Sequence, residues 1–468
     1  LAIDLGDTYF YIDSLDRAKA MYREALRYYE GSGDLRAIVE QQYKLGQCHL
    51  TGGEYEPARR EILKGLAQLV DGTVTDYGNV NPASVKDVDL FGQGLANAGF
   101  VDFTEGRERK DVRGLLNALQ LVQKSVDVLD ARKGSVLTGT QTESEAVKNV
   151  NAYRLLVDVA SALFGATRDE RYFGLAFDMS EKSRAASFVS EVGSQLITKL
   201  HDPKVKELAE ATSRLIEEGK NQPEALTLDL TSLGQGTRGI GTKGGGSRDG
   251  DEKTRSQYEK IVTRLSAENN KAAQLVTVNT LTLSSVRSLL LENEVLINYY
   301  VSIDKLYAFG VSTSGVIMKT IHWTPEDVSG KVEAYRAAVH DLQKNDYAVL
   351  GQELYDSLIA PLGAFIEGKR LIAIPSGRLN SLPFAGLQNK GEFLAERYET
   401  SVLPNASTLQ FVRKEKKLPG APSVFALGNP DNPRVSRLPG AEKEVGQVKS
   451  IYPRSLIHFG EQATETIA

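Results

Sequence analysis

Apolar residues recur with the spacing of amphipathic helices over roughly the first two hundred residues of the chain. Two segments, 1–30 and 41–70, carry the same order of small and large residues, shifted by 40 positions. Because glycine and alanine let neighbouring helices approach closely, this pattern predicts packed helical pairs that repeat along the chain. The matched positions are Leu5 and Leu45, Gly6 and Gly46, Tyr9 and His49, Ala18 and Ala58, and Ala25 and Gly65.

Further helices are expected to extend this array. Residues 111–130 and 150–190 have the apolar spacing of buried helices. A repeat array needs several stacked units to bury its apolar faces. We therefore predict one α-helical superhelix over residues 1–200.

Residues 201–273 differ in character and are predicted to form a separate segment. Within it, 203–219 and 251–272 have the pattern of charged amphipathic helices, and 234–250 is rich in glycine. The glycine-rich stretch lacks apolar periodicity, which favours a flexible loop. It contains a G-x-G-x-x-G sequence at 234–239, but no helix is predicted to open at its last glycine, as a dinucleotide site requires. No nucleotide or other cofactor is predicted.

From about residue 274 the spacing becomes that of β-strands separated by helices. Helices are predicted over 325–344 and 349–366. Since strands that alternate with helices favour a sheet covered on both faces, we predict a mostly parallel sheet here. The strands are expected at 276–283, 295–301, 306–311, 315–318 and 370–375.

The last part of the chain has a regular alternation of its own. A strand is predicted at 424–427, a helix at 440–452, and a second strand at 455–459. A further helix is expected to begin near Thr464, a residue suited to cap it. This order predicts the opening β–α–β–α layers of a parallel α/β unit.

Composition and charge exclude several classes of protein. The net charge of -5 argues against a nucleic-acid binder or a protein of anionic membrane surfaces. No run of 18 apolar residues is present, so no membrane span is predicted. A single cysteine suits a reducing cytoplasm, and the five scattered histidines give no metal signature.

Individual residues with possible chemistry are interpreted as structural. Cys48 and His49 are adjacent on one predicted helix and point in different directions, so Cys48 is read as a packing residue. Ser376 lacks the G-x-S-x-G context of a nucleophile and is read as a turn residue. His458 and His322 are expected to make structural hydrogen bonds within or beside strands.

The order of short sequence blocks resembles a known family. Residues 1–70 resemble the tetratricopeptide repeat, and the C-terminal part resembles the CHAT domains, which are caspase-like and related to separase. The block at 180–185 is similar to the helix that often precedes such domains. The blocks that carry the CHAT resemblance are 374–379, 382–387, 393–398, 403–407, 426–430 and 438–444.

This resemblance implies a multidomain α plus α/β protein from a bacterial cytoplasm. It would comprise a tetratricopeptide-like α-solenoid over 1–200 and a caspase-like α/β domain with a mostly parallel sheet over 274–468. The non-catalytic part of that domain would be 274–390, and the catalytic half would begin at 420–468.

The same resemblance implies a cysteine endopeptidase that cleaves protein substrates after a partner binds to its repeats. The catalytic His and Cys of such a domain are expected after Ala468, outside this chain. Asn429 and Asp431 follow the first strand of the catalytic half and are candidates for the substrate groove. The alternative is a catalytically inactive scaffold that binds a protein or peptide partner. Neither hypothesis requires nucleic acid, a membrane, a metal or a cofactor.

Overall fold

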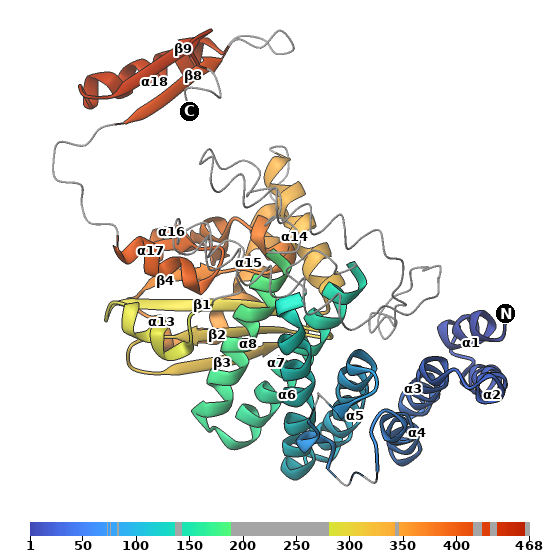
Figure 1. Ribbon diagram of the computed structural model, residues 1–468. Coiled ribbons are helices and arrows are strands. Elements are labelled where there is room, and N and C mark those ends of the chain that lie inside the picture. The colour runs from blue at the N-terminus through green and yellow to red at the C-terminus, as the bar shows by residue number, and fades with distance from the viewer. Residues whose placement is uncertain are drawn as a thin grey trace. The chain divides into compact units, whose positions relative to one another are not determined.

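The computed structural model describes residues 1–72, 74, 76–81, 84–135, 143–188, 280–341, 346–414, 424–430 and 438–463 (Figure 1). It divides into two compact units, Leu1–Leu409 and Gln410–Ala468, which are considered separately. The helices predicted over 203–219 and 251–272 and the loop at 234–250 lie outside the described residues.

The first part of unit 1 is helical, as the sequence predicts. Consecutive helices pack against one another in chain order, and α3 also contacts α5, as α5 contacts α7 (Figure 1). A short 3-10 helix at Tyr77–Asn79 lies between α4 and α5. The helices are α1 (Ala2–Tyr11), α2 (Leu15–Ser32), α3 (Leu35–Thr51), α4 (Tyr55–Gln68), α5 (Val88–Arg109), α6 (Val112–Ser135), α7 (Glu143–Thr167) and α8 (Glu170–Phe188).

Small residues at equivalent positions bring the first two helical pairs into close contact. A Cβ atom on Gly6 would lie 2.5 Å from Cε1 of Tyr22, and one on Gly46 would lie 2.6 Å from Cγ1 of Ile62. These distances are too short for real side chains, so both positions require glycine for the observed packing. The period of 40 residues read from the sequence therefore corresponds to a repeated contact between helices.

The other repeated positions differ in burial. Ala18, Ala58 and Ala25 are buried between helices, and Tyr9 packs partly buried against the same cluster as Ala18. Leu45 is 3% exposed because α2 covers it, whereas Leu5 is 39% exposed. Leu5 lies on α1, so the two equivalent leucines differ in exposure although the glycines beside them make the same kind of contact.

The second part of unit 1 is built on a five-stranded sheet with the order β3-β2-β1-β4-β7. Helix α13 (Leu283–Leu289) precedes the sheet, and α14 (Pro325–His340) and α15 (Asp346–Leu358) lie between β3 and β4. The strands are β1 (Glu294–Val301), β2 (Leu306–Val311), β3 (Val316–Ile321), β4 (Arg370–Ile374) and β7 (Thr400–Val402).

Short elements complete unit 1 between β4 and the boundary. The turns after β4 bring Phe384 onto the sheet, where its ring stacks on Tyr299 with centroids 5.4 Å apart. These elements are the 3-10 helices Gly377–Ser381, Phe384–Gly386 and Ala406–Thr408, the strands β5 (Gln388–Asn389) and β6 (Glu392–Phe393), α16 (Leu394–Arg397) and α17 (Leu409–Lys414), which begins at the boundary. A further 3-10 helix, Ala360–Phe365, lies between α15 and β4.

The two faces of the sheet bury different sets of residues. On one face, Phe309 and Leu296 share a core with Phe173 and Phe177 of α8. On the other face, residues such as Val295 share a core with α14 and α15. The strands alternate between the two faces, as the period of two requires. One continuous core therefore joins helices α5 to α8 to the sheet.

The prediction of a mostly parallel sheet is wrong for these five strands. The pairs β1–β4 and β4–β7 are parallel, but β1–β2 and β2–β3 are antiparallel, so the sheet is mixed. The connections 302–305 and 312–315 contain only four residues each. Connections this short can join only antiparallel strands, because a parallel pair needs a long crossover.

The prediction of a strand at 276–283 is also wrong for residues 280–283, the part of this range that the structure describes. Residues 280–282 have no strand structure, and Leu283 opens α13. The hydroxyl of Thr282 accepts a hydrogen bond from the backbone N–H of Ser285 and so caps this helix. The cap outweighs the alternating apolar pattern of the preceding residues.

Unit 2 contains the β–α–β order predicted from the sequence. It comprises β8 (Phe425–Pro430), α18 (Pro439–Ile451) and β9 (Leu456–Gly460). The two strands pair in parallel, with Phe425 opposite Leu456 and Ala426 opposite Ile457. The prediction of adjacent parallel strands is therefore confirmed. The helix expected to begin near Thr464 lies outside the described residues.

The close approach at Gly46 yields a testable prediction. Gly46→Ala should destabilise the protein by about 1–3 kcal/mol, because the new methyl group overlaps Ile62. Gly31→Ala is the matched control: Gly31 lies inside α2 with no atom near its missing Cβ, so alanine should be neutral or stabilise by up to about 1 kcal/mol. Urea unfolding followed by far-UV circular dichroism measures both. Equal effects at the two positions would contradict the packing described here.

Candidate functional site

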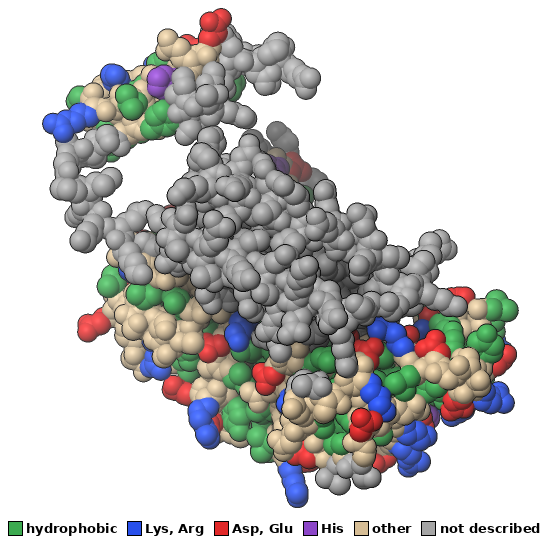
Figure 2. Space-filling model, viewed as in Figure 1, with side chains coloured by type: hydrophobic (Ala, Val, Ile, Leu, Met, Phe, Trp, Pro, Cys, Tyr) green, Lys and Arg blue, Asp and Glu red, His purple; other side chains and the backbone are tan. Residues whose placement is uncertain are grey.

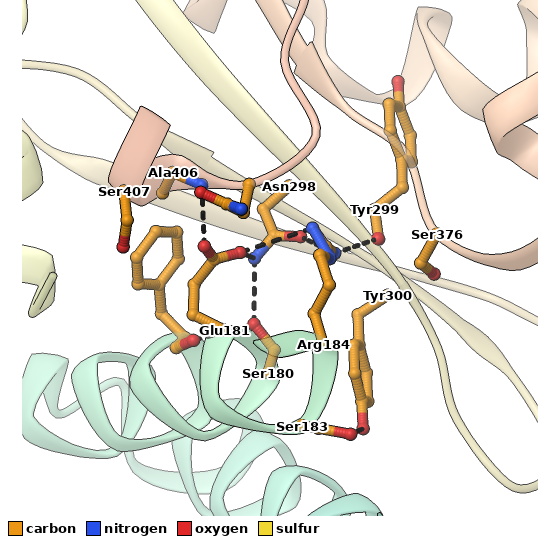
Figure 3. A network of polar contacts seen from close by, with 12 residues as sticks. Ser180, Glu181, Ser183, Arg184, Asn298, Tyr299, Tyr300, Ser376, Ala406 and Ser407 are labelled. Atoms are coloured by element: carbon orange, nitrogen blue, oxygen red, sulfur yellow. Dashed lines mark hydrogen bonds and ion pairs between the residues drawn. The ribbon is translucent and has the colours of Figure 1, made fainter. Parts of the chain in front are cut away.

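A cluster of polar side chains is buried between α8 and the sheet (Figure 3). Asn298 lies in the middle of β1, is fully buried, and faces α8. Its amide nitrogen donates to the hydroxyl of Ser180 at 2.8 Å and to Oε1 of Glu181 at 3.2 Å. The central strand β1 and helix α8 are thus joined by polar contacts inside an otherwise apolar core.

Glu181 connects three separate parts of the chain. Its side chain is fully buried. Oε1 accepts from Nη1 of Arg184 at 3.3 Å, and Oε2 accepts from the backbone N–H of Ala406 at 2.7 Å. Ala406 belongs to the 3-10 turn that follows β7, so the carboxylate holds that turn as well as the strand.

Arg184 completes the cluster from the next turn of α8. Its Nη2 donates to Oδ1 of Asn298 at 2.7 Å and to the carbonyl oxygen of Tyr299 at 3.1 Å. Its Nε has no partner among the described residues. We call Ser180, Glu181, Arg184, Asn298 and the Ala406 amide the α8 network.

The charges of the α8 network depend on one another. Burial raises the pKa of the Glu181 carboxyl, and this rise is opposed by the Arg184 guanidinium and the Ala406 N–H. Burial lowers the pKa of Arg184, and the nearby Glu181 carboxylate opposes that fall. If one partner is removed, the other is left as a buried charge without compensation.

Contacts beside the α8 network join the same elements. The hydroxyl of Tyr300 in β1 donates to that of Ser183 in α8 at 3.0 Å. The carboxylate of Asp178 accepts from the backbone N–H of Leu283 at 2.7 Å, which ties α8 to α13. Burial raises the pKa of Asp178 to about 6.

A second buried carboxylate joins α7 to the strands. Asp158 accepts hydrogen bonds from the hydroxyls of Ser302 at 2.6 Å and Tyr307 at 2.7 Å. Burial raises its pKa to about 6, and the two hydroxyl donors oppose the rise. Helices α7 and α8 are therefore both fixed to the β-sheet part of unit 1 through buried carboxylates.

The chemistry of the α8 network is that of a structural lock. It has a carboxylate, a guanidinium and an amide that bond to one another, with only Nε of Arg184 left without a partner among the described residues, and it presents no thiol or imidazole to a substrate. A nucleophile needs an adjacent base held within hydrogen-bonding distance. The network is therefore suited to transmit a change in the position of α8 to β1 and to the turn at Ala406.

Of the two residues predicted to line a substrate groove, Asn429 and Asp431, the structure describes the first. Asn429 is 7% exposed and has a left-handed backbone, with φ of 48°. Its Nδ2 donates to Glu442 at 2.6 Å, and its Oδ1 accepts from the backbone N–H of Leu438 at 2.8 Å. These bonds fix the start of α18 beside β8. Asp431 lies outside the described residues, and a groove at these positions stays a prediction.

The other residues weighed in the sequence have structural contacts. Cys48 is fully buried, and burial raises the pKa of its thiol to about 12, which suits a packing residue and not a thiolate nucleophile. Ser376 accepts a hydrogen bond from the backbone N–H of Val301 at 3.0 Å. His458 lies in β9 with its ring 5.9 Å from that of Phe425.

The blocks 180–185 and 403–407, which the sequence presents as separate motifs, are in contact in the structure. Their contact joins residues 225 positions apart, from Glu181 to Ala406. One signal in the sequence pointed toward it: Asn298 interrupts the apolar run 295–301 of a buried strand. A polar side chain in such a strand requires a hydrogen-bonding partner from another element.

Comparison with known proteins bears on the second half of the chain. Residues 348–467 match the CHAT domain. This match supports the resemblance of the C-terminal part of the chain to the CHAT family. It covers part of each compact unit, including the parallel strands β8 and β9. A search of curated proteins found no match. The tetratricopeptide resemblance of the repeats lies before the matched residues and stays a prediction.

The described residues also bear on membrane spanning and metal binding. No described helix has both the length and the apolar character needed to cross a bilayer. The same residues contain no group of three or more His, Cys, Asp and Glu side chains arranged to hold a metal ion.

The dependence of Arg184 on Glu181 can be measured. Glu181→Ala should destabilise unit 1 by about 3–5 kcal/mol, because it leaves the guanidinium of Arg184, whose side chain is only 13% exposed, without a counter-charge. The control is Glu170→Ala on the same helix, where the carboxylate is more than half exposed and pairs with Arg287 at 3.3 Å. That pair should contribute less than about 1 kcal/mol. Urea unfolding can be followed by the fluorescence of Trp323, the single tryptophan. If Glu181→Ala lowers the free energy of unfolding no more than Glu170→Ala does, the structural role given to Glu181 is wrong.

Proposed function

We propose that this chain is the repeat arm and the first part of a CHAT-type, caspase-like cysteine endopeptidase. The repeats bind a protein or peptide partner, and partner binding triggers cleavage of a protein substrate. The observation that carries the proposal is the CHAT match at residues 348–467, which includes the parallel β8–α18–β9 unit. A cytoplasmic location and independence from nucleic acid and cofactors belong to the same proposal.

The chemistry of such an enzyme requires a thiol and a base that act together. A histidine withdraws the thiol proton, and the thiolate attacks the peptide carbonyl. Cys48 does not serve this purpose, because it is buried among repeat helices and its pKa is raised to about 12. On this proposal, the catalytic His and Cys belong to sequence that follows Ala468.

The α8 network gives the proposed regulation a physical route. Helix α8 continues the series of repeat helices, and Glu181 and Arg184 fix it to β1 and to the turn at Ala406. A partner that shifts the repeats would either break these hydrogen bonds or move β1 together with α8. Figure 2 shows Lys and Arg side chains interspersed with Asp and Glu over the visible repeat helices, a surface suited to a protein partner of mixed charge.

The test uses the natural protein that contains residues 1–468. Its following residues should encode a strand that ends in His-Gly and, some tens of residues later, a second strand followed by Cys. Extracts of the source cell supply the partner, and fluorescent casein reports cleavage. Replacing the downstream Cys by Ala should abolish cleavage, and Cys48→Ala should retain it because this residue only packs.

Two results would contradict the enzyme proposal. The first is the lack of either downstream residue, and the second is cleavage that survives loss of the downstream Cys. Lack of the His or Cys together with saturable binding of a protein to the repeats would favour the inactive scaffold.

A further inference from the structure

A hollow of about 540 Å³ lies between the repeat helices and the sheet, apart from the α8 network. Its walls come from α5, α6 and α7 on one side and from β2 and β3 on the other. This volume is within the range of small-molecule sites, which commonly lie where two structural layers meet. The hollow is therefore large enough for an organic ligand.

Part of the wall is apolar. Phe103 of α5, Leu115 of α6 and Met318 of β3 all line the hollow. Phe103 and Leu115 are nearly fully buried in the core that joins the helices to the sheet. A ligand with an apolar body would gain by covering these side chains, whereas a bare inorganic ion would not.

Positive charge exceeds negative charge around the same hollow. Arg107, Lys110 and Lys305 line it. Arg107 and Lys305 share one carboxylate, that of Asp304, at 3.2 and 3.5 Å. Lys110 has no ion-pair partner in the described part of the chain. The carboxylate of Asp158 is also near, bonded to the lining residue Tyr307. Three cations beside the two carboxylates of Asp304 and Asp158 leave an excess of positive charge, which favours an anionic ligand.

Ser161 supplies an independent indication of a ligand. It lies on α7, lines the hollow and is 1% exposed, yet its hydroxyl has no hydrogen-bond partner among the described residues. Leaving a buried hydroxyl unpaired destabilises the folded state. The nearby Tyr307 hydroxyl is already committed to Asp158 at 2.7 Å. The Ser161 hydroxyl is thus an uncommitted hydrogen-bonding group beside the hollow.

We propose that this hollow binds a small organic anion, a carboxylate on a short apolar body. The carboxylate lies among Arg107, Lys110 and Lys305, and the body covers the apolar wall. Ser161 donates a hydrogen bond to the ligand. Because the walls belong to both the repeats and the sheet, a bound ligand holds these two layers together. This site is independent of the proposed peptidase activity.

The test is a titration of residues 1–468 with 4-fluorophenylacetate, followed by fluorine NMR. The neutral amide of the same shape, 4-fluorophenylacetamide, is the matched ligand. The carboxylate should bind saturably at millimolar concentrations and more tightly than the amide. Lys110→Asn should weaken its binding by about two- to fivefold, the range for one exposed charge. Asparagine suits this site because Lys110 has a φ of 54°.

Two further variants separate binding from folding. Ser161→Ala should weaken binding while leaving the protein no less stable, because it removes an unpaired buried hydroxyl. Lys64→Gln, which removes an exposed lysine on α4, should leave binding unchanged. The proposal is overturned if the carboxylate shows no saturable binding, if the amide binds as tightly, or if Lys64→Gln weakens binding as much as Lys110→Asn.

Discussion

The burial of Glu181 and Arg184 between a helix and a strand is the constraint on which unit 1 depends. Two charges removed from water persist only where every partner is in place. Here the partners come from β1 and from the turn at Ala406, which lie 114 to 225 residues away along the chain. The relative positions of these three segments are therefore fixed by hydrogen-bond geometry and not by apolar contact alone.

This constraint explains why the repeat helices and the sheet form one compact unit. Apolar contacts such as Phe173 on Phe309, with ring centroids 5.6 Å apart, tolerate small sliding movements. The buried bonds of Glu181 and Asp158 do not, because a shifted donor leaves a carboxylate unpaired. A displacement of α7 or α8 is thus coupled to the sheet, and the hollow lined by Ser161 lies between the same two layers.

Most of the helices and strands could be predicted from the sequence, but fewer of the strand directions and long-range contacts. Apolar periodicity placed the repeat helices, β1, β2 and β4, and the parallel pair β8 and β9. The antiparallel course of β1, β2 and β3 could have been predicted from the four-residue connections, which outweigh the general preference for parallel sheets. The helix at 283–289 depended on a single cap at Thr282. The α8 network could not be predicted from the sequence, because no local pattern shows which distant backbone amide a buried glutamate will bind.

Amide hydrogen exchange in unit 1 can show whether α8 and β1 form one cooperative structure. We expect the amides of both elements to exchange through a common opening, with equal protection that falls in parallel as denaturant is added. Exchange of α8 through a smaller, separate opening, while β1 stays fully protected, would show that the helix moves independently of the sheet and would contradict this expectation.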